Sequence, residues 1–229
     1  MRLDRYLSQV TELSRSESRQ LIRAGRVSVD GLAIAQPAHH VDRCAEILLD
    51  DRRLERPLPR YYMVNKPAGV VCATQDPSHR TILDLLDLER SDTLHIAGRL
   101  DIDATGLVLV TDDGQWSHRI TSPARRCGKT YLVALKHPLK ESQAATLRQG
   151  VSLRNESKPT RPADLQMVDE THLRLTITEG RYHQVKRMFA AVGNRVIGLH
   201  RESIGSLTLD QRLSPGDCRA LTQQEVDCF

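Results

Sequence analysis

The chain has 229 residues, a length that fits one large domain or a small domain followed by a medium one. Hydrophobic residues make up 39% and charged residues 27%, which is enough apolar material for a packed core and excludes a disordered chain. The net charge of +4 rests mainly on arginine, since six of the 33 basic residues are lysine, and an aromatic content of 3% argues against an aromatic-lined sugar or peptide groove.

The first 50 residues predict a small unit made of two helices and a hairpin. Apolar residues recur at helical spacing over residues 3–10. Ser14 and Glu17 form a capping box for a second helix, which runs to about residue 24. Two short alternating strands then flank Asp30-Gly31, a dipeptide typical of tight hairpin turns.

Four arginines of this unit, Arg15, Arg19, Arg23 and Arg26, follow one another at spacings of four, four and three. Such spacing places them along one helical stripe that continues into the first strand. Glu17 is the one acid between residues 13 and 29, so arginine dominates the stripe. We expect a surface that contacts phosphates, and the alternative is an ordinary solvated helix face.

A charged stretch with two prolines, residues 51–60, reads as a linker between domains. We therefore place a small basic domain at 1–55, a linker at 56–60 and a second domain at 61–229. Strands of the second domain are predicted at 61–65, 69–73, 95–99, 106–111, 129–135, 163–168, 172–178, 195–199 and 205–209, and helices at 80–88, 115–121, 140–149, 181–192 and 222–227. Strands outnumber long helices without regular alternation, which favours an α+β fold with a mixed, largely antiparallel sheet flanked by helices.

The segment with the most distinctive chemistry lies between two apolar strands and reads Gly98-Arg-Leu-Asp101-Ile-Asp103-Ala-Thr105-Gly106. Loops of this kind present carboxylates on a rigid scaffold. The spacing alone leaves three interpretations open. The aspartates bond to their own turn, or Asp101 and Asp103 form a magnesium-dependent phosphatase loop, or Asp101 is a single nucleophile kept ionised by a cation.

The loop resembles the catalytic motif of the pseudouridine synthases, in particular the branch that modifies ribosomal RNA. Three further stretches agree with that family in the same order: Asn65-Lys66-Pro67-x-Gly69, Lys129-Thr130-Tyr131 and Glu179-Gly-Arg-Tyr-His-Gln-Val-Lys-Arg-Met188. Residues 1–50 resemble the RNA-binding domain that this branch shares with a small-subunit ribosomal protein and some tRNA synthetases. The resemblance covers nearly the whole chain, and length and both halves point to the enzymes that act on small-subunit (16S) rRNA.

The resemblance implies isomerisation of a specific uridine to pseudouridine, with Asp101 as the catalytic carboxylate. Asp101 would attack C1′ or C6 or remove a proton from C2′, and the sequence does not choose among them. A buried cation should keep it ionised, which the resemblance assigns to Lys186, with Arg181 second. Tyr131 is the expected base-stacking residue.

Further residues receive supporting roles from the same resemblance. Arg99 is expected to hold the displaced nucleotide or fill its gap, and Lys129 is expected to contact RNA. His183 and Gln184 are expected to be structural, orienting the start of the last long helix.

No cofactor or metal is expected from the sequence. The five cysteines form no Cys-x-x-Cys pair, and the nine histidines form no His-Glu-x-x-His. No apolar run approaches the ~18 residues of a membrane span, and the N-terminus lacks a signal-like segment, so a cytoplasmic protein is predicted. We expect a monomer. The resemblance implies that its partner is ribosomal RNA, free or within an assembling small subunit. The competing functions are a large-subunit enzyme of the same family, a non-catalytic RNA-binding assembly protein and a metal-dependent phosphatase.

Overall fold

The computed structural model describes residues 1–42, 44–55 and 58–229, and the chain divides into two units, Met1–Leu58 and Pro59–Phe229. The sequence placed these domains at 1–55 and 61–229. Residues 56 and 57 of the predicted linker lie outside the described residues.

The first unit packs two helices on a small antiparallel sheet whose strand order is β2-β1-β3-β4. Its elements are α1 (Leu3–Val10), α2 (Arg15–Arg23), β1 (Val27–Val29), β2 (Leu32–Ala33), β3 (Ile47–Leu49) and β4 (Arg52–Arg53). The Ser14 hydroxyl accepts from the Glu17 amide and the Glu17 carboxylate accepts from the Ser14 amide, as the capping-box prediction requires. The predicted turn is also present, with φ of +49° at Asp30 and +80° at Gly31.

The charged stretch 51–60 is not irregular throughout, because Arg52–Arg53 form β4 and pair with β3, inside the domain predicted at 1–55. Neither strand was predicted from the sequence. A two-residue edge strand carries no apolar alternation, so its charged side chains read as linker composition.

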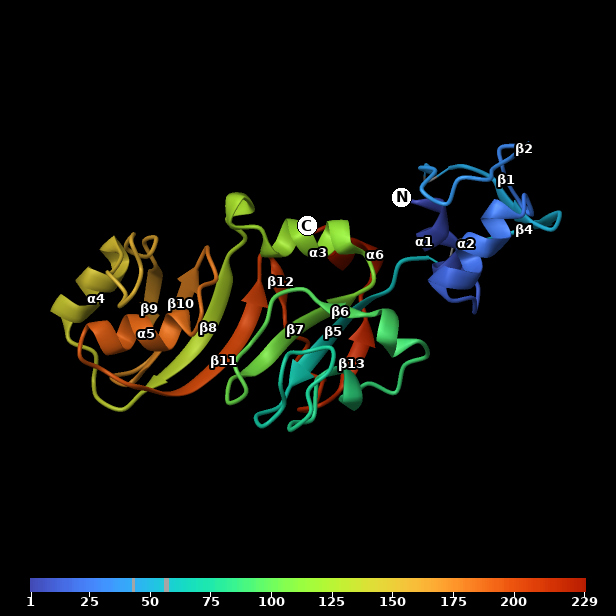
Figure 1. Ribbon diagram of the computed structural model, residues 1–229. Coiled ribbons are helices and arrows are strands. Elements are labelled where there is room, and N and C mark those ends of the chain that lie inside the picture. The colour runs from blue at the N-terminus through green and yellow to red at the C-terminus, as the bar shows by residue number, and fades with distance from the viewer. Residues whose placement is uncertain (43, 56–57) are drawn as a thin grey trace. The chain divides into compact units, whose positions relative to one another are not determined.

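The second unit is built on one mixed sheet with helices on both faces (Figure 1). Its strand order is β13-β5-β7-β11-β8-β10-β9, with β12 paired to β11 and β6 to β7. The elements are β5 (Tyr61–Lys66), η1 (Leu83–Leu85), η2 (Ser91–Thr93), β6 (His95–Ile96), β7 (Thr105–Thr111), α3 (Gly114–Thr121), η3 (Pro123–Arg125), β8 (Lys129–Leu135), α4 (Glu141–Gln149), β9 (Asp164–Met167), β10 (His172–Ile177), α5 (Gln184–Ala191), β11 (Val196–Ile204), β12 (Leu207–Thr208), β13 (Cys218–Ala220) and α6 (Gln223–Val226). Among the described pairs, β11 with β7 is parallel and the others are antiparallel, which confirms the predicted fold class.

Two apolar clusters form on opposite faces of this sheet, because successive residues of a strand point to opposite sides. Val64 joins α5 and the side chains of β8 and β10, whereas Met63 joins Trp116 and α3. Trp116 is fully buried and meets the rings of Tyr61 and Phe229 edge-on, with centroids 4.9 and 5.4 Å away.

Two predicted elements are wrong. Segment 69–73 is not a strand, since in it Val71 forms one isolated bridge to Thr81, and segment 80–88 contains a single 3-10 turn at Leu83–Leu85 rather than a helix. Both segments bury apolar side chains in the cluster that contains Val64. They therefore have the apolar content of a strand or a helix, although their backbones do not form its regular hydrogen bonds. Other predicted elements shifted at their ends. The strand expected at 195–199 extends to Ile204, and β13 was missed.

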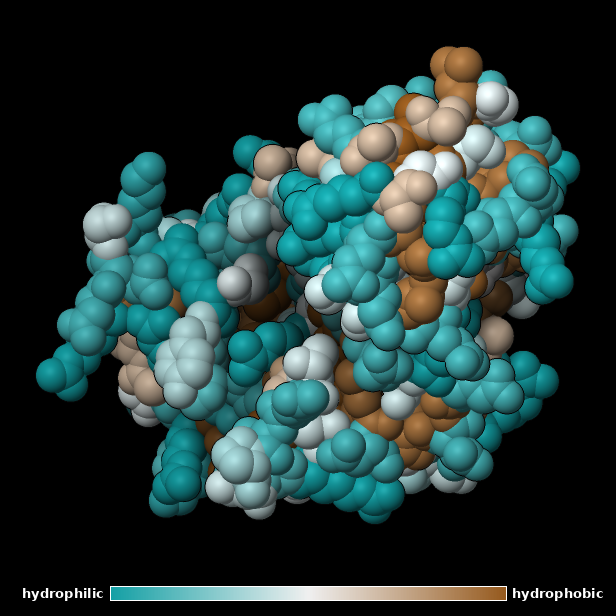
Figure 2. All heavy atoms as spheres, turned by 45° about the vertical axis from the view of Figure 1, so that its right-hand side comes forward, coloured by the Kyte–Doolittle hydropathy of each residue, from teal (hydrophilic) through white to brown (hydrophobic). Residues whose placement is uncertain are grey.

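The surface of the molecule is largely polar. On the face drawn in Figure 2, hydrophilic side chains cover most of the area and hydrophobic ones appear in small groups between them. Among the described residues, no helix combines the length and hydropathy needed to span a membrane.

Candidate active site

Asp101 lies in the loop between β6 and β7, and its carboxylate points at basic groups of a distant segment. The Oδ2 atom is 3.2 Å from Lys186 Nζ, and Oδ1 is 3.5 Å from His183 Nε2. The side chain is 24% exposed, so solvent or substrate reaches it. The loop turns on its backbone, where the Ala104 amide donates to the Asp101 carbonyl, so the carboxylate is not used to close its own turn.

Lys186, near the start of α5, serves two carboxylates at once. Its Nζ is 2.5 Å from Asp103 Oδ1 as well as 3.2 Å from Asp101 Oδ2. Burial works to lower the pKa of Lys186, but the hydrogen bonds and charges of both aspartates outweigh it and raise that pKa. The hydrogen bond from Lys186 likewise lowers the pKa of Asp103. The expected cation is therefore beside Asp101, but it is half-buried, with 27% of its side chain exposed.

Tyr131, on β8, is 7% exposed and reaches the loop through an arginine that the sequence did not single out. The guanidinium carbon of Arg201, on β11, lies 5.9 Å from the centre of the Tyr131 ring. Arg201 Nε donates to the Leu107 carbonyl at 2.7 Å, and its Nη atoms donate to the carbonyls of Gly98 at 2.9 Å and Arg99 at 3.3 Å. Arg201 thus connects the expected stacking residue to the loop that carries Asp101.

A second buried cation, Lys66, holds the other half of the loop. Its Nζ donates to the carbonyls of Ala104 at 2.7 Å, Pro67 at 2.9 Å and Ile102 at 3.2 Å, and burial lowers its pKa. Lys66 is fully buried and Arg201 is 1% exposed. Lys66 belongs to one of the four motifs of the resemblance, and Arg201 ends a stretch, residues 180–201, that contains no Asp or Glu, but neither pattern reports burial.

The structure corrects the expectation for Lys129. The residue is 8% exposed, and its Nζ donates to the carbonyls of Cys127 at 2.9 Å and Ile120 at 3.4 Å. Burial lowers the pKa of this lysine. An ammonium occupied by backbone carbonyls stabilises the turn before β8 and is not presented to RNA.

Arg181 and Arg99, expected near the substrate, have different surroundings. Arg181 donates to the carbonyls of Lys158 and Pro159, both at 2.8 Å, and pairs with Glu179 at 3.2 Å, so it anchors a neighbouring loop rather than Asp101. The Arg99 side chain is exposed and has no hydrogen-bond or ion-pair partner among the described residues, which leaves it available to a ligand.

Gln184 has the structural role that was expected, whereas His183 reaches the site. The Gln184 side chain accepts from the Arg181 amide and donates to Glu179 Oε1, each at 2.9 Å. His183 adopts φ of +47°, and this left-handed conformation is why α5 begins at Gln184 and not at the predicted residue 181.

The arginine stripe of the first unit splits into two kinds. Arg19 pairs with the buried carboxylate of Asp4 at 3.0 Å and Arg26 pairs with Asp50. Hydrogen bonds, first from Arg2 and then from Arg19, lower the pKa of Asp4 to about 2 against the opposing effect of burial. Arg15 and Arg23 are exposed and have no ion-pair partner among the described residues, so they are the members of the stripe that are free to meet phosphates.

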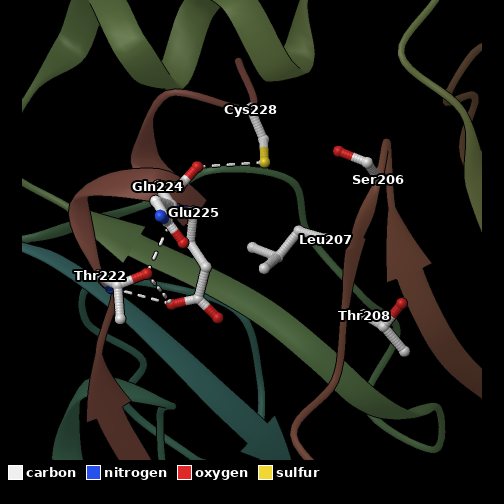
Figure 3. Close-up of a pocket in the computed structure, with 7 residues that line it drawn as sticks. All are labelled: Ser206, Leu207, Thr208, Thr222, Gln224, Glu225 and Cys228. Carbon is white, nitrogen blue, oxygen red and sulfur yellow. Dashed lines mark hydrogen bonds between the residues drawn. The ribbon is translucent and has the colours of Figure 1, made fainter.

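A hollow of about 390 Å³ lies away from these groups, between β12 and α6 (Figure 3). Its one carboxylate, Glu225, caps α6 through Thr222 and pairs with Arg219 at 2.7 Å. The hollow therefore has no free charged group of its own. Within the described part of the chain, no group of three His, Cys, Asp or Glu side chains is arranged to hold a metal ion.

Comparisons with known proteins agree with this arrangement. The family model for RNA pseudouridylate synthase matches residues 60–191, and the model for the S4 domain matches residues 1–47. Proteins called ribosomal small subunit pseudouridine synthase A are 53% identical in Yersinia pestis, over 99% of this chain and 97% of the relative, and 52% identical in Escherichia coli K12, over 99% and 98%. A crystal structure of a pseudouridylate synthase superposes with a TM-score of 0.73 at 46% identity, covering 99% of this chain and 98% of that one.

Proposed function

The chain belongs to the RNA pseudouridylate synthase family, and on that premise we propose that it isomerises one specific uridine of small-subunit (16S) ribosomal RNA to pseudouridine, with Asp101 as the catalytic carboxylate. The target is proposed because the relatives that match along the whole chain act, by their names, on the small ribosomal subunit. The observation that carries the role of Asp101 is its half-buried carboxylate, held by Lys186 and His183 and unused by its own loop.

The reaction breaks the bond between N1 of uracil and C1′ of the ribose, rotates the base and joins C5 to C1′. The proton lost from C5 is balanced by one gained at N1, so no redox partner is needed. Asp101 supplies a carboxylate oxygen at the sugar or the base, and Lys186 holds that carboxylate in place through its 3.2 Å contact. This scheme uses side chains alone and requires no cofactor.

Access to Asp101 requires the uridine to leave the base stack, which costs a few kcal/mol. Arg99 lies two residues before Asp101 in the loop, exposed and unpaired within the described residues, where it can contact the displaced nucleotide or occupy its gap. Tyr131 is proposed to stack on the uracil, with the Arg201 guanidinium holding the ring from 5.9 Å away. Contacts of Arg15 and Arg23 with RNA phosphates would offset the cost of extrusion and make affinity fall as salt rises.

The two units have separate proposed roles. The first, with its S4 match, grips the RNA, and the second carries the chemistry. We expect the protein to act as a monomer in the cytoplasm, on free ribosomal RNA or an assembling small subunit. A metal-dependent phosphatase is disfavoured because the ammonium of Lys186 lies between the carboxylates of Asp101 and Asp103, where such an enzyme needs its cation.

The decisive experiment maps pseudouridines in both ribosomal RNAs from cells that lack the protein. One missing site in small-subunit RNA is the expected result. A missing site in large-subunit RNA would show that the target is the large subunit. An unchanged map would show that the protein is a non-catalytic RNA-binding protein. Activity that persists in excess chelator on a transcript of the same RNA would exclude the phosphatase alternative.

Purified variants test the role of Asp101 against a neighbour in the same loop. Asp101→Asn should abolish pseudouridine formation and leave RNA affinity nearly unchanged, because the change removes a charge without removing volume. Asp103→Asn is the matched control, since its carboxylate also contacts Lys186 but is 67% exposed, and it should retain activity. Full activity of Asp101→Asn would end the assignment.

A further inference from the structure

Tyr182 is the one aromatic side chain that this chain exposes, and the chain has few. The composition includes one Trp, five Tyr and two Phe, all within the described residues. The other seven are buried or half-buried, whereas Tyr182 is 76% exposed. Its hydroxyl has no hydrogen-bond partner among the described residues, so hydrogen bonding does not explain why a tyrosine is there.

The position of Tyr182 places it at the rim of the site. Its ring lies on the ring of His183, with centroids 3.9 Å apart and planes inclined by 17°, and His183 Nε2 is 3.5 Å from Asp101 Oδ1. One face of the Tyr182 ring is therefore covered and the other is open. A stack of two rings that ends in an open face beside the catalytic carboxylate is a surface on which a third flat ring fits.

The segment that carries Tyr182 is held rigidly although its ring is free. The Tyr182 carbonyl accepts from Arg187 Nη1 at 3.1 Å, and Arg187 is fixed in turn by the Arg154 carbonyl at 2.6 Å and Glu156 at 3.1 Å. His183 is left-handed at φ of +47°, a conformation that non-glycine residues adopt at an energetic cost. Such strain persists where the surroundings enforce it, and it concentrates at functional sites. The platform is thus formed before any ligand arrives.

We propose that the open face of Tyr182 stacks on a nucleobase of the substrate RNA that flanks the extruded uridine. The inference rests on the proposed function, because an RNA strand that delivers a uridine to Asp101 must pass the neighbouring Tyr182–His183 stack. The exposed Arg99, whose side chain has no partner among the described residues, suits the phosphates of that strand. Single-stranded RNA is recognised by stacking of unpaired bases on aromatic rings, and every base has a face to offer.

The kinetic test compares Tyr182→Ala, Tyr182→Phe and the control Ile197→Ala, which removes another exposed apolar side chain of the same unit. The substrate is a transcript of small-subunit ribosomal RNA, and the readout is KM and kcat for pseudouridine formation. Loss of one stacked base should raise KM roughly 5- to 150-fold in Tyr182→Ala, leaving kcat at saturation nearly constant. Tyr182→Phe retains the ring and should match the wild type, as should the control.

Two kinetic results would overturn the proposal. An unchanged KM in Tyr182→Ala would show that no base is bound there. A fall in kcat with unchanged KM, restored by Tyr182→Phe, would show that the ring positions His183 and does not contact RNA.

Cross-linking separates this proposal from the proposed function. Irradiation of the wild type with the same transcript carrying 5-iodouridine should attach RNA at Tyr182, as located by mass spectrometry of the peptide, and the attachment should be absent in Tyr182→Ala. If the wild type makes no pseudouridine, the proposed function fails, and the presence or absence of the Tyr182 cross-link still decides whether the ring binds RNA.

Discussion

Replacement of Arg201 by methionine should destabilise the second unit strongly. Arg201 is 1% exposed and donates to three carbonyls, two of them at 2.7 and 2.9 Å. Hydrogen bonds from a charged donor contribute about 1.5–3 kcal/mol each, and the carbonyls of Leu107 and Gly98 lose this donor when the side chain is removed. Methionine fills the space and removes the cost of a buried charge, which offsets part of the lost hydrogen bonding. We therefore expect the free energy of unfolding to fall by about 3–5 kcal/mol.

The assay uses the fluorescence of Trp116 during urea unfolding. Trp116 is the single tryptophan of the chain and is fully buried in the second unit, so its signal reports that unit irrespective of the first. Arg212→Met is the control, because its side chain is 88% exposed and its loss should change stability by less than about 0.5 kcal/mol. A loss below about 1 kcal/mol for Arg201→Met would refute the idea that this side chain holds the loop.

Three further predictions are measured by Trp116 fluorescence during urea unfolding or by RNA affinity. Gly106→Ala should lower the free energy of unfolding by more than about 2 kcal/mol, because an added Cβ would lie 2.4 Å from a backbone oxygen of β11. Gly216→Ala is the control: its φ of +99° is close to the +100° of Gly106, but its Cβ would enter open space, so only the backbone is strained. Equal losses in the two variants would contradict this. Burial, followed by the hydrogen bond to Asp113, raises the pKa of Tyr61 to about 12. Its neutral form therefore stabilises the fold fully below the unfolded pKa of about 10 and loses that contribution as pH rises towards 12. The stability advantage of wild type over Tyr61→Phe should shrink between pH 8 and 11.5, and a constant difference would refute this. Joint replacement of Arg15 and Arg23 by glutamine should lower the slope of log affinity against log salt by about 2 without loss of folding, and an unchanged slope would assign phosphate binding elsewhere.

Elements defined by local chemistry could be predicted from the sequence. The capping box at Ser14 and Glu17 and the Asp30-Gly31 turn act within four residues, and both formed as expected. Segments 69–73 and 80–88 were misassigned because their apolar residues are buried against distant parts of the sheet. Those residues do not mark one face of a strand or a helix. An irregular segment that is buried by tertiary contacts has the same apolar residue types as a buried strand or helix, although its backbone forms no regular hydrogen bonds.

The site was predictable to the extent that motifs mark residues on the surface of the loop. Asp101 and Lys186 are 85 residues apart in the chain, and their side chains lie 3.2 Å apart in the fold, as the resemblance implied. The buried cations could not be identified in this way. A sequence shows that Lys66 and Lys129 are basic, but a basic residue reads as a surface residue unless the partners that replace water are known, and here those partners are backbone carbonyls.

The distribution of cations explains how the loop keeps a carboxylate available. Arg201 and Lys66, both buried, bind carbonyls on the two sides of Asp101, so the loop holds its shape without help from its own side chains. Lys186 is half exposed and binds carboxylates instead, and it shares its charge between Asp101 and the more exposed Asp103. If the fold of the loop depended on Asp101, its substitution would damage structure and chemistry together. Because the buried cations carry the fold, Asp101→Asn should unfold in urea at the wild-type midpoint while losing activity, and a large shift of that midpoint would show that the carboxylate supports the loop after all.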